Sequence, residues 1–151
     1  DLITKMFWGF WATGGFAVLF NVPVRALLAS GLTGAVGVGV RTVFLAQGSH
    51  AATATFCAAL TVGLIGYVLA KRFHMPRAIF TVTGIIPLVP GVPAFESLVF
   101  FMQDDIPAGL EFAVLAGLVV AAIGTGLVSA RLLVSLVEKS RRSATFGRFA
   151  R

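Results

Sequence analysis

The chain has 151 residues, of which 58% are hydrophobic and only 12% are charged, and its mean hydropathy is +0.95. Soluble globular domains carry about 25% charged residues, so this composition excludes an ordinary soluble domain and predicts a membrane protein. Twelve basic and six acidic residues give a net charge of +6. The basic residues cluster beside apolar stretches, which favours a role in membrane orientation over nucleic-acid binding. The single cysteine, Cys57, excludes an internal disulfide and a cysteine metal cluster.

Five stretches are apolar and long enough to cross a bilayer as helices of about 20 residues. In chain order they are approximately 6–22, 26–46, 52–70, 78–102 and 112–136. They lack the two-residue alternation of barrel strands, so they favour α-helices. The sequence therefore predicts an all-α polytopic membrane domain over residues 1–138, followed by a basic cytoplasmic tail over 139–151.

The basic residues predict an orientation, because short basic loops stay in the cytoplasm. With the first loop inside, one side collects nine basic residues: Arg25, Lys71, Arg72, Arg77, Lys139, Arg141, Arg142, Arg148 and Arg151. The other side has Lys5 as its one basic residue and four acidic ones: Asp1, Asp104, Asp105 and Glu111. We therefore expect the N-terminus outside and the C-terminus in the cytoplasm.

The first span ends at Asn21-Val22-Pro23, where proline stops the helix and Asn21 is placed to bind carbonyls that the helix leaves unpaired. The second span contains Arg41. Residues 26–40 alone give about 22 Å of helix, too short to cross, so the helix must continue past this arginine. An arginine inside a membrane costs from about 2.5 to over 10 kcal/mol, which predicts a functional or inter-subunit role. The alternative is that its side chain reaches outward to the lipid headgroups.

Glycines within the spans predict close helix packing, because small residues let helix backbones approach each other. Ser30 with Gly34 in the second span and Gly117 with Ala121 in the fifth have the required spacing. We therefore expect the second, third and fifth helices to pack tightly together.

The fourth span contains Pro87, Pro90, Gly91 and Pro93 within seven residues. Three prolines remove three backbone donors, so we expect a discontinuous helix. In transporters such breaks lie near the midplane, where the N-terminus of a half-helix points at an anionic substrate group. The alternative is a proline kink that only shapes the bundle.

Glu96 is the one acidic residue well inside a span, and we expect it in the first turn of the second half-helix, where a carboxylate is favoured. One hypothesis is a proton-coupling group that leaves this turn to a substrate carboxylate when it is protonated. The alternative is a carboxylate that only caps the helix or pairs with Arg41.

The remaining features point to no further chemistry. Arg131 follows about 19 apolar residues, so its side chain is expected to reach the cytoplasmic headgroups. His50 and His74 lie in separate loops, and no phosphate-binding loop, zinc signature or nucleophile motif is present. We therefore expect no metal, no cofactor and no enzyme activity.

Three features together resemble the threonine/serine exporter (ThrE) family, in particular its short YjjB-like membrane half. They are Phe20-Asn21-Val22-Pro23 with Arg25-Ala26-Leu27, the glycine-rich stretch of the second helix up to Arg41, and Ile86-Pro87-Leu88-Val89-Pro90-Gly91. The resemblance covers nearly the whole chain. It carries over to Asn21, Arg41, Pro87, Pro90 and Gly91 as site residues, whereas Glu96 departs from the family pattern.

The resemblance implies a bacterial inner-membrane secondary exporter of small carboxylates, such as threonine, serine or succinate. It also implies a complementary YjjP-like five-helix half, as a separate chain or fused upstream, and an oligomeric assembly. Substrate carboxylate is expected at Arg41 and at the amides of the helix break. The alternative from another class is a non-transporting membrane scaffold or assembly subunit, in which glycines and breaks serve packing alone.

Overall fold

The structure is a computed structural model that describes the backbone of residues 1–149 and the side chains of residues 1–140. This part of the chain is all-α, as the sequence predicts. Its elements are α1 (Leu2–Leu19), α2 (Val24–Ala46), α3 (Ala51–Phe73), α4 (Arg77–Ile85), the 3-10 helix η1 (Ile86–Leu88), α5 (Gly91–Met102) and α6 (Ile106–Phe149). The tail arginines Arg141, Arg142, Arg148 and Arg151 lie outside the described side chains.

Four helices are long and apolar enough to cross a membrane: α1, α2, α3 and the Ile106–Ser140 part of α6. A fifth span is formed if α4 with η1 and α5 are counted as one unit, which bends by 47° at the break. The protein is therefore a multi-pass membrane protein whose fourth span is discontinuous.

Helix α6 is longer than its predicted span, 112–136. It begins at Ile106, where the Asp105 carboxylate accepts a hydrogen bond from the Ala108 amide at 3.2 Å and Pro107 occupies the first turn. Beyond this start no proline interrupts the helix, so it continues through the predicted tail to Phe149. Hydropathy found the apolar middle of the helix and missed its polar ends.

Helices α1 to α4 form a bundle in which backbones approach closely. A Cβ atom added at Gly34 of α2 would lie 1.8 Å from Thr13 Oγ1 of α1, and one at Gly126 of α6 would lie 2.8 Å from the Phe56 carbonyl oxygen of α3. A Cβ at Gly37 of α2 would lie 2.8 Å from Val62 Cγ2 of α3, so α3 packs tightly against both α2 and α6. The expectation that α2 and α6 also pack together was wrong for the described residues, where these two helices make no extensive contact and Gly34 faces α1. At Gly117 the expectation was wrong, because a Cβ there would meet nothing within 4 Å.

One end of the bundle is closed by an apolar cluster of Ala17, Val22, Ala26, Ala70 and Phe80. These residues join the end of α1, the start of α2, the end of α3 and the start of α4. The helix ends around this cluster carry Arg25, Lys71, Arg72 and Arg77. The fold therefore gathers at one end the basic residues between the spans that the sequence assigns to the cytoplasmic side.

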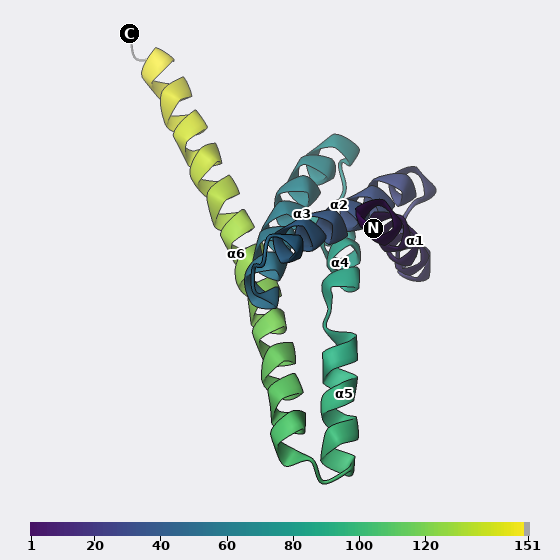
Figure 1. Ribbon diagram of the computed structural model, residues 1–151. Coiled ribbons are helices and arrows are strands. Elements are labelled where there is room, and N and C mark those ends of the chain that lie inside the picture. The colour runs from purple at the N-terminus through teal and green to yellow at the C-terminus, as the bar shows by residue number, and fades with distance from the viewer. Residues whose placement is uncertain (150–151) are drawn as a thin grey trace.

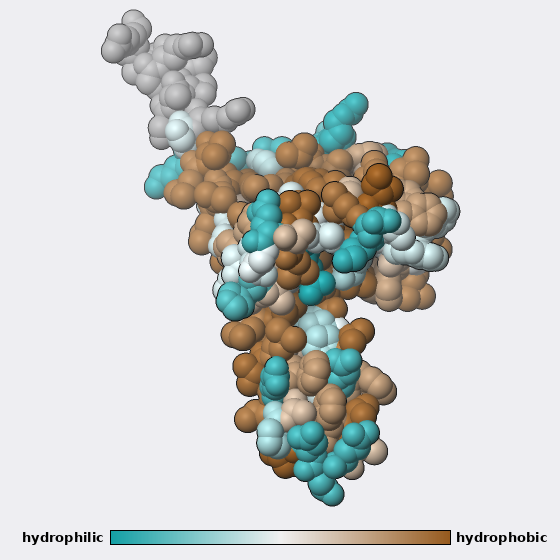
Figure 2. Space-filling model, viewed as in Figure 1, coloured by the Kyte–Doolittle hydropathy of each residue, from teal (hydrophilic) through white to brown (hydrophobic). Residues whose placement is uncertain are grey.

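Helix α5 and the first half of α6 form a hairpin that runs away from the bundle (Figure 1). Helix α6 is the one element against which α5 packs extensively in the described part of the chain. Most of the surface in view is apolar, and hydrophilic side chains gather at the tip of this hairpin (Figure 2). The turn at the tip contains Asp104 and Asp105, so the acidic end and the basic end of the molecule lie far apart.

Candidate functional site

Arg41 lies inside α2, which continues beyond it to Ala46, as its predicted span requires. The side chain is half-buried, and its Nε donates a hydrogen bond of 3.1 Å to Oγ1 of the fully buried Thr55 on α3. In the described residues no carboxylate lies within ion-pair distance of it. A guanidinium has five N–H donors, so the four on the terminal nitrogens remain for a ligand with two acceptor oxygens.

The break after α4 is short and mostly self-satisfied. Helix η1 is followed by Val89 in an extended conformation, and α5 begins at Gly91. The Gly91 amide donates to Val89 O at 2.9 Å and the Ala94 amide to Pro90 O at 3.1 Å. Pro93 has no amide hydrogen. In the first turn of α5, the Val92 amide therefore has no backbone acceptor in the described chain. The break thus offers fewer free amide donors than the sequence suggested.

The fold brings this break against the helix that carries Arg41. A Cβ at Gly37, one turn before Arg41, would lie 3.6 Å from Gly84 O and 3.7 Å from Leu88 Cδ1. The same Cβ would lie 2.8 Å from Val62 Cγ2 of α3. Residues four apart lie on the same face of a helix, so Arg41 follows Gly37 on the side where α2 meets α3, α4 and η1. Leu88 is 1% exposed, and its apolar cluster includes residues of α3 and α6. Pro90 is buried, Pro87 is half-buried and Gly91 is exposed.

Glu96 lies elsewhere than the sequence predicts. It is the sixth residue of α5, so it belongs to the second turn, and the first turn holds no acidic residue. Because α5 starts already at Gly91, Glu96 lies roughly 7 Å further along the axis than the break. It is half-exposed in an open groove along α5 with a volume of about 500 Å³. The suggested ion pair with Arg41 is absent from the described residues.

Asn21 does not share a site with Arg41. It adopts a left-handed conformation, with φ 55°, directly after α1. The Asn21 amide donates to Val18 O and the Val22 amide to Ala17 O, both at 2.9 Å, which is the Schellman arrangement that closes helix ends. Arg41 lies about 25 Å further along α2. Asn21 therefore terminates α1, and it does so through its backbone.

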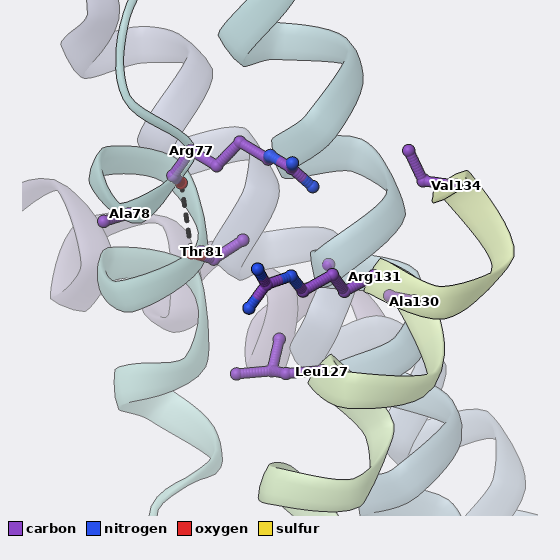
Figure 3. A pocket seen from close by; sticks show the side chains of 8 residues that line it. Arg77, Ala78, Thr81, Leu127, Ala130, Arg131 and Val134 are labelled. Atoms are coloured by element: carbon purple, nitrogen blue, oxygen red, sulfur yellow. Dashed lines mark hydrogen bonds between the residues drawn. The ribbon is translucent and has the colours of Figure 1, made fainter. Parts of the chain in front are cut away.

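A second basic site was not predicted from the sequence. Arg77 of α4 and Arg131 of α6 extend toward the same cleft, with a volume of about 390 Å³, between these helices and α3 (Figure 3). Each arginine was assigned singly to a cytoplasmic loop or to the headgroups. Because they are 54 positions apart, only the packing of α6 on α3 shows that they belong together.

Beside this cleft, a hydrogen-bonded group joins the ends of α3 and α6. The Glu138 carboxylate accepts hydrogen bonds from Tyr67 Oη and, at 2.8 Å, from Lys71 Nζ. The Arg77 guanidinium lies 5.3 Å from the centre of the Tyr67 ring. Within residues 1–140, no group of three or more His, Cys, Asp or Glu side chains could hold a metal ion.

Comparison with known proteins agrees with the resemblance seen in the sequence. The family model described as "Threonine/Serine exporter, ThrE" matches residues 5–133, which is well over half of the 151 residues. No solved structure matches the chain. A multi-pass helical bundle with a discontinuous span, matched over nearly its whole length by this model, belongs to the threonine/serine exporter (ThrE) family.

Proposed function

We propose that this chain is one half of a secondary exporter for small carboxylate metabolites, and that Arg41 binds the substrate carboxylate. Members of the ThrE family are threonine/serine exporter-type transporters. The candidate substrates are threonine and serine, or dicarboxylates such as succinate. The observation that carries the proposal is an arginine within a spanning helix, bound to the chain through one hydrogen bond to Thr55 and lying on the side of α2 that contacts the broken span.

The chemistry of this site suits a carboxylate. The Thr55 contact uses Nε and orients the guanidinium, and the terminal nitrogens can donate two parallel hydrogen bonds to a carboxylate. Pro87, Pro90 and Gly91 bend the neighbouring span there, so the amide of Val92 is a further donor at the break. Asn21 acts in this proposal as the helix end that fixes where α2 begins, and Glu96 as a proton-coupling group outside the carboxylate site.

The assembly we propose pairs this bundle with a YjjP-like five-helix half, as a separate chain or fused to it. Two five-span halves in series have opposite orientations, the arrangement of transporters that rock one repeat against the other. The bundle would lie in the bacterial inner membrane with its basic end in the cytoplasm. Support comes from the fold, which gathers Arg25, Lys71, Arg72 and Arg77 at one end and Asp104 and Asp105 at the other.

The test is counterflow of labelled threonine, serine and succinate in proteoliposomes that contain this chain and its partner half. Arg41→Gln removes the charge but leaves a polar side chain. Hydrogen bonds to charged groups contribute about 1.5–3 kcal/mol, so we expect a loss of about 10-fold to 100-fold in apparent substrate affinity. Arg41→Lys keeps the charge but lacks the planar guanidinium, so its loss of apparent substrate affinity should be intermediate.

The matched control is Arg25→Gln, which removes the same charge from the same helix at the opposite end. Its counterflow should equal that of the wild type. Equal activity of Arg41→Gln and the wild type would overturn the role of Arg41. Absence of counterflow in the wild type, with the partner half present, would favour the scaffold alternative.

A further inference from the structure

The cleft between α4 and α6 combines positive charge with an apolar floor. Arg77 and Arg131 lie on its two sides, and Figure 3 shows both guanidinium groups extending into the space between the helices. The floor is formed by Gly63, Leu127, Ala130 and Val134. A ligand that fills this cleft therefore needs an anionic group beside an apolar part.

The two arginines have no neutralising partner in the described part of the chain. No carboxylate there lies within 4.0 Å of either guanidinium, and the nearby Glu138 is bound to Lys71 at 2.8 Å and to Tyr67. Two cations that share a cleft repel each other, and the repulsion grows where the surroundings are apolar. An anion between them would remove this repulsion and use both sets of donors.

The position of the cleft indicates where the anion comes from. Arg77 is the first residue of α4, at the basic end of the bundle. Counted from Phe112, where the apolar part of α6 begins, Arg131 lies about 28 Å along the helix. This distance is close to the roughly 30 Å of a hydrocarbon core, so the long side chain of Arg131 reaches the depth of the lipid headgroups. Both side chains are exposed, so the cleft is accessible from outside the bundle.

We propose that the Arg77–Arg131 cleft binds the anionic headgroup of a membrane phospholipid. The phosphate lies between the two guanidinium groups, and the glycerol and the upper acyl carbons lie along Leu127, Ala130 and Val134. A soluble phosphate or dicarboxylate offers the same oxygen atoms but gains nothing from the apolar floor. Basic sites between spanning helices at the cytoplasmic face suit such headgroups.

The experiment is a native mass spectrometry titration of the full-length protein, delipidated in a neutral detergent. The probes are phosphatidylglycerol and phosphatidylcholine with the same acyl chains. An arginine near anionic lipid contributes about a 5-fold gain in affinity, so Arg77→Gln with Arg131→Gln should weaken phosphatidylglycerol binding by about 25-fold. Phosphatidylcholine carries the same phosphate together with a choline cation that the arginines repel, so it should bind the wild type more weakly and lose less affinity than phosphatidylglycerol in the variant.

A matched control removes two charges from the same end of the molecule but outside the cleft: Arg72→Gln with Lys139→Gln. It should keep wild-type affinity for phosphatidylglycerol. Equal losses in the two double variants would mean that general surface charge attracts the lipid, which would overturn the site. Equal binding of the two lipids would overturn it as well.

Two further variants and a competition experiment complete the test. Arg77→Lys with Arg131→Lys keeps the charge and should retain most of the affinity, and the single change Arg131→Gln should lose about 5-fold. These variants carry the test if the glutamine pair does not elute as a single folded species. Displacement of phosphatidylglycerol by millimolar glycerol phosphate or succinate would assign the cleft to a soluble anion and overturn the lipid assignment.

Discussion

Helices α1 and α2 meet along several glycines, whereas α5 and α6 meet at one glycine, Gly109 against the ring of Phe101, and at a pair of stacked aromatic rings. Gly34 lies directly against Thr13, which is fully buried, and a Cβ at Gly31 would lie 2.7 Å from the ring of Phe10. In the hairpin, the rings of Phe100 and Phe112 stack with their centroids 5.3 Å apart. Inside a membrane no hydrophobic effect holds helices together, so close approach at glycines stabilises the bundle, and the stacked rings add to it in the hairpin.

The bundle and the hairpin also differ in the surroundings of their side chains. The bundle helices surround one another, and buried hydroxyls such as Thr33 and Thr83 donate to carbonyls of their own helices. In the hairpin, α6 also packs against α3, but α5 packs extensively only against α6 among the described elements. Large side chains remain exposed along the hairpin: Val92, Phe95, Leu98, Met102, Ile106, Leu110 and Val114. This surface is apolar enough to face lipid or the proposed partner half.

The largest expected effect concerns the two ends of these regions, which should lie on opposite sides of the membrane. In a Cys57→Ala background, an impermeant maleimide added to intact cells should label Gln103→Cys at the hairpin tip. It should label Arg72→Cys at the basic end of the bundle only after lysis. Labelling of Arg72→Cys in intact cells would contradict the proposed orientation.

Adding one methyl group should separate the two packing modes. Gly34→Ala forces its Cβ against Thr13 and should destabilise the protein by about 1–3 kcal/mol. Gly117→Ala has open space and should stabilise it by up to about 1 kcal/mol through helix propensity. Opposite shifts of the thermal unfolding midpoint in detergent would bear this out. Thr13→Ala combined with Gly34→Ala should recover part of the loss.

Removing a hairpin ring should have a smaller and local effect. Phe112→Ala loses the stack with Phe100, worth about 0.5–1.5 kcal/mol beyond the buried area. Amide hydrogen exchange should rise in α5 and remain unchanged in α2 and α3. Phe95→Ala is the control, because this side chain is 68% exposed. An equal rise of exchange in the bundle would show that the two regions unfold as one unit.

The smallest effect on stability is expected for Glu96→Gln, because the side chain is half-exposed and has no ion pair among the described residues. The proposed proton coupling predicts that export by this variant no longer responds to an imposed pH gradient. Glu111→Gln, an exposed carboxylate near the hairpin tip, should keep the response. An unchanged response in Glu96→Gln would remove this residue from the mechanism.

The sequence predicted the position of Arg41 inside a spanning helix and the break at Pro87–Gly91 because each violates a strong local rule, whereas the role of Arg41 stays a prediction. A charge in an apolar run and prolines within a helix are visible without any neighbour. The pairing of Arg77 with Arg131 was not visible, because each arginine alone is explained by its place at a span end. Glu96 was placed one turn too early, since the sequence does not say at which residue a helix resumes after three prolines.

Composition and hydropathy by themselves determined the membrane environment, the all-α class, the five apolar stretches and the discontinuous span. These follow from local physics, because backbone in a bilayer must satisfy its own hydrogen bonds and proline removes one. The tertiary structure decided which helices touch, that α5 leaves the bundle with α6, and that two distant arginines share a cleft. Such pairings depend on shape between helices, where the presence or absence of a single Cβ decides how closely two backbones approach.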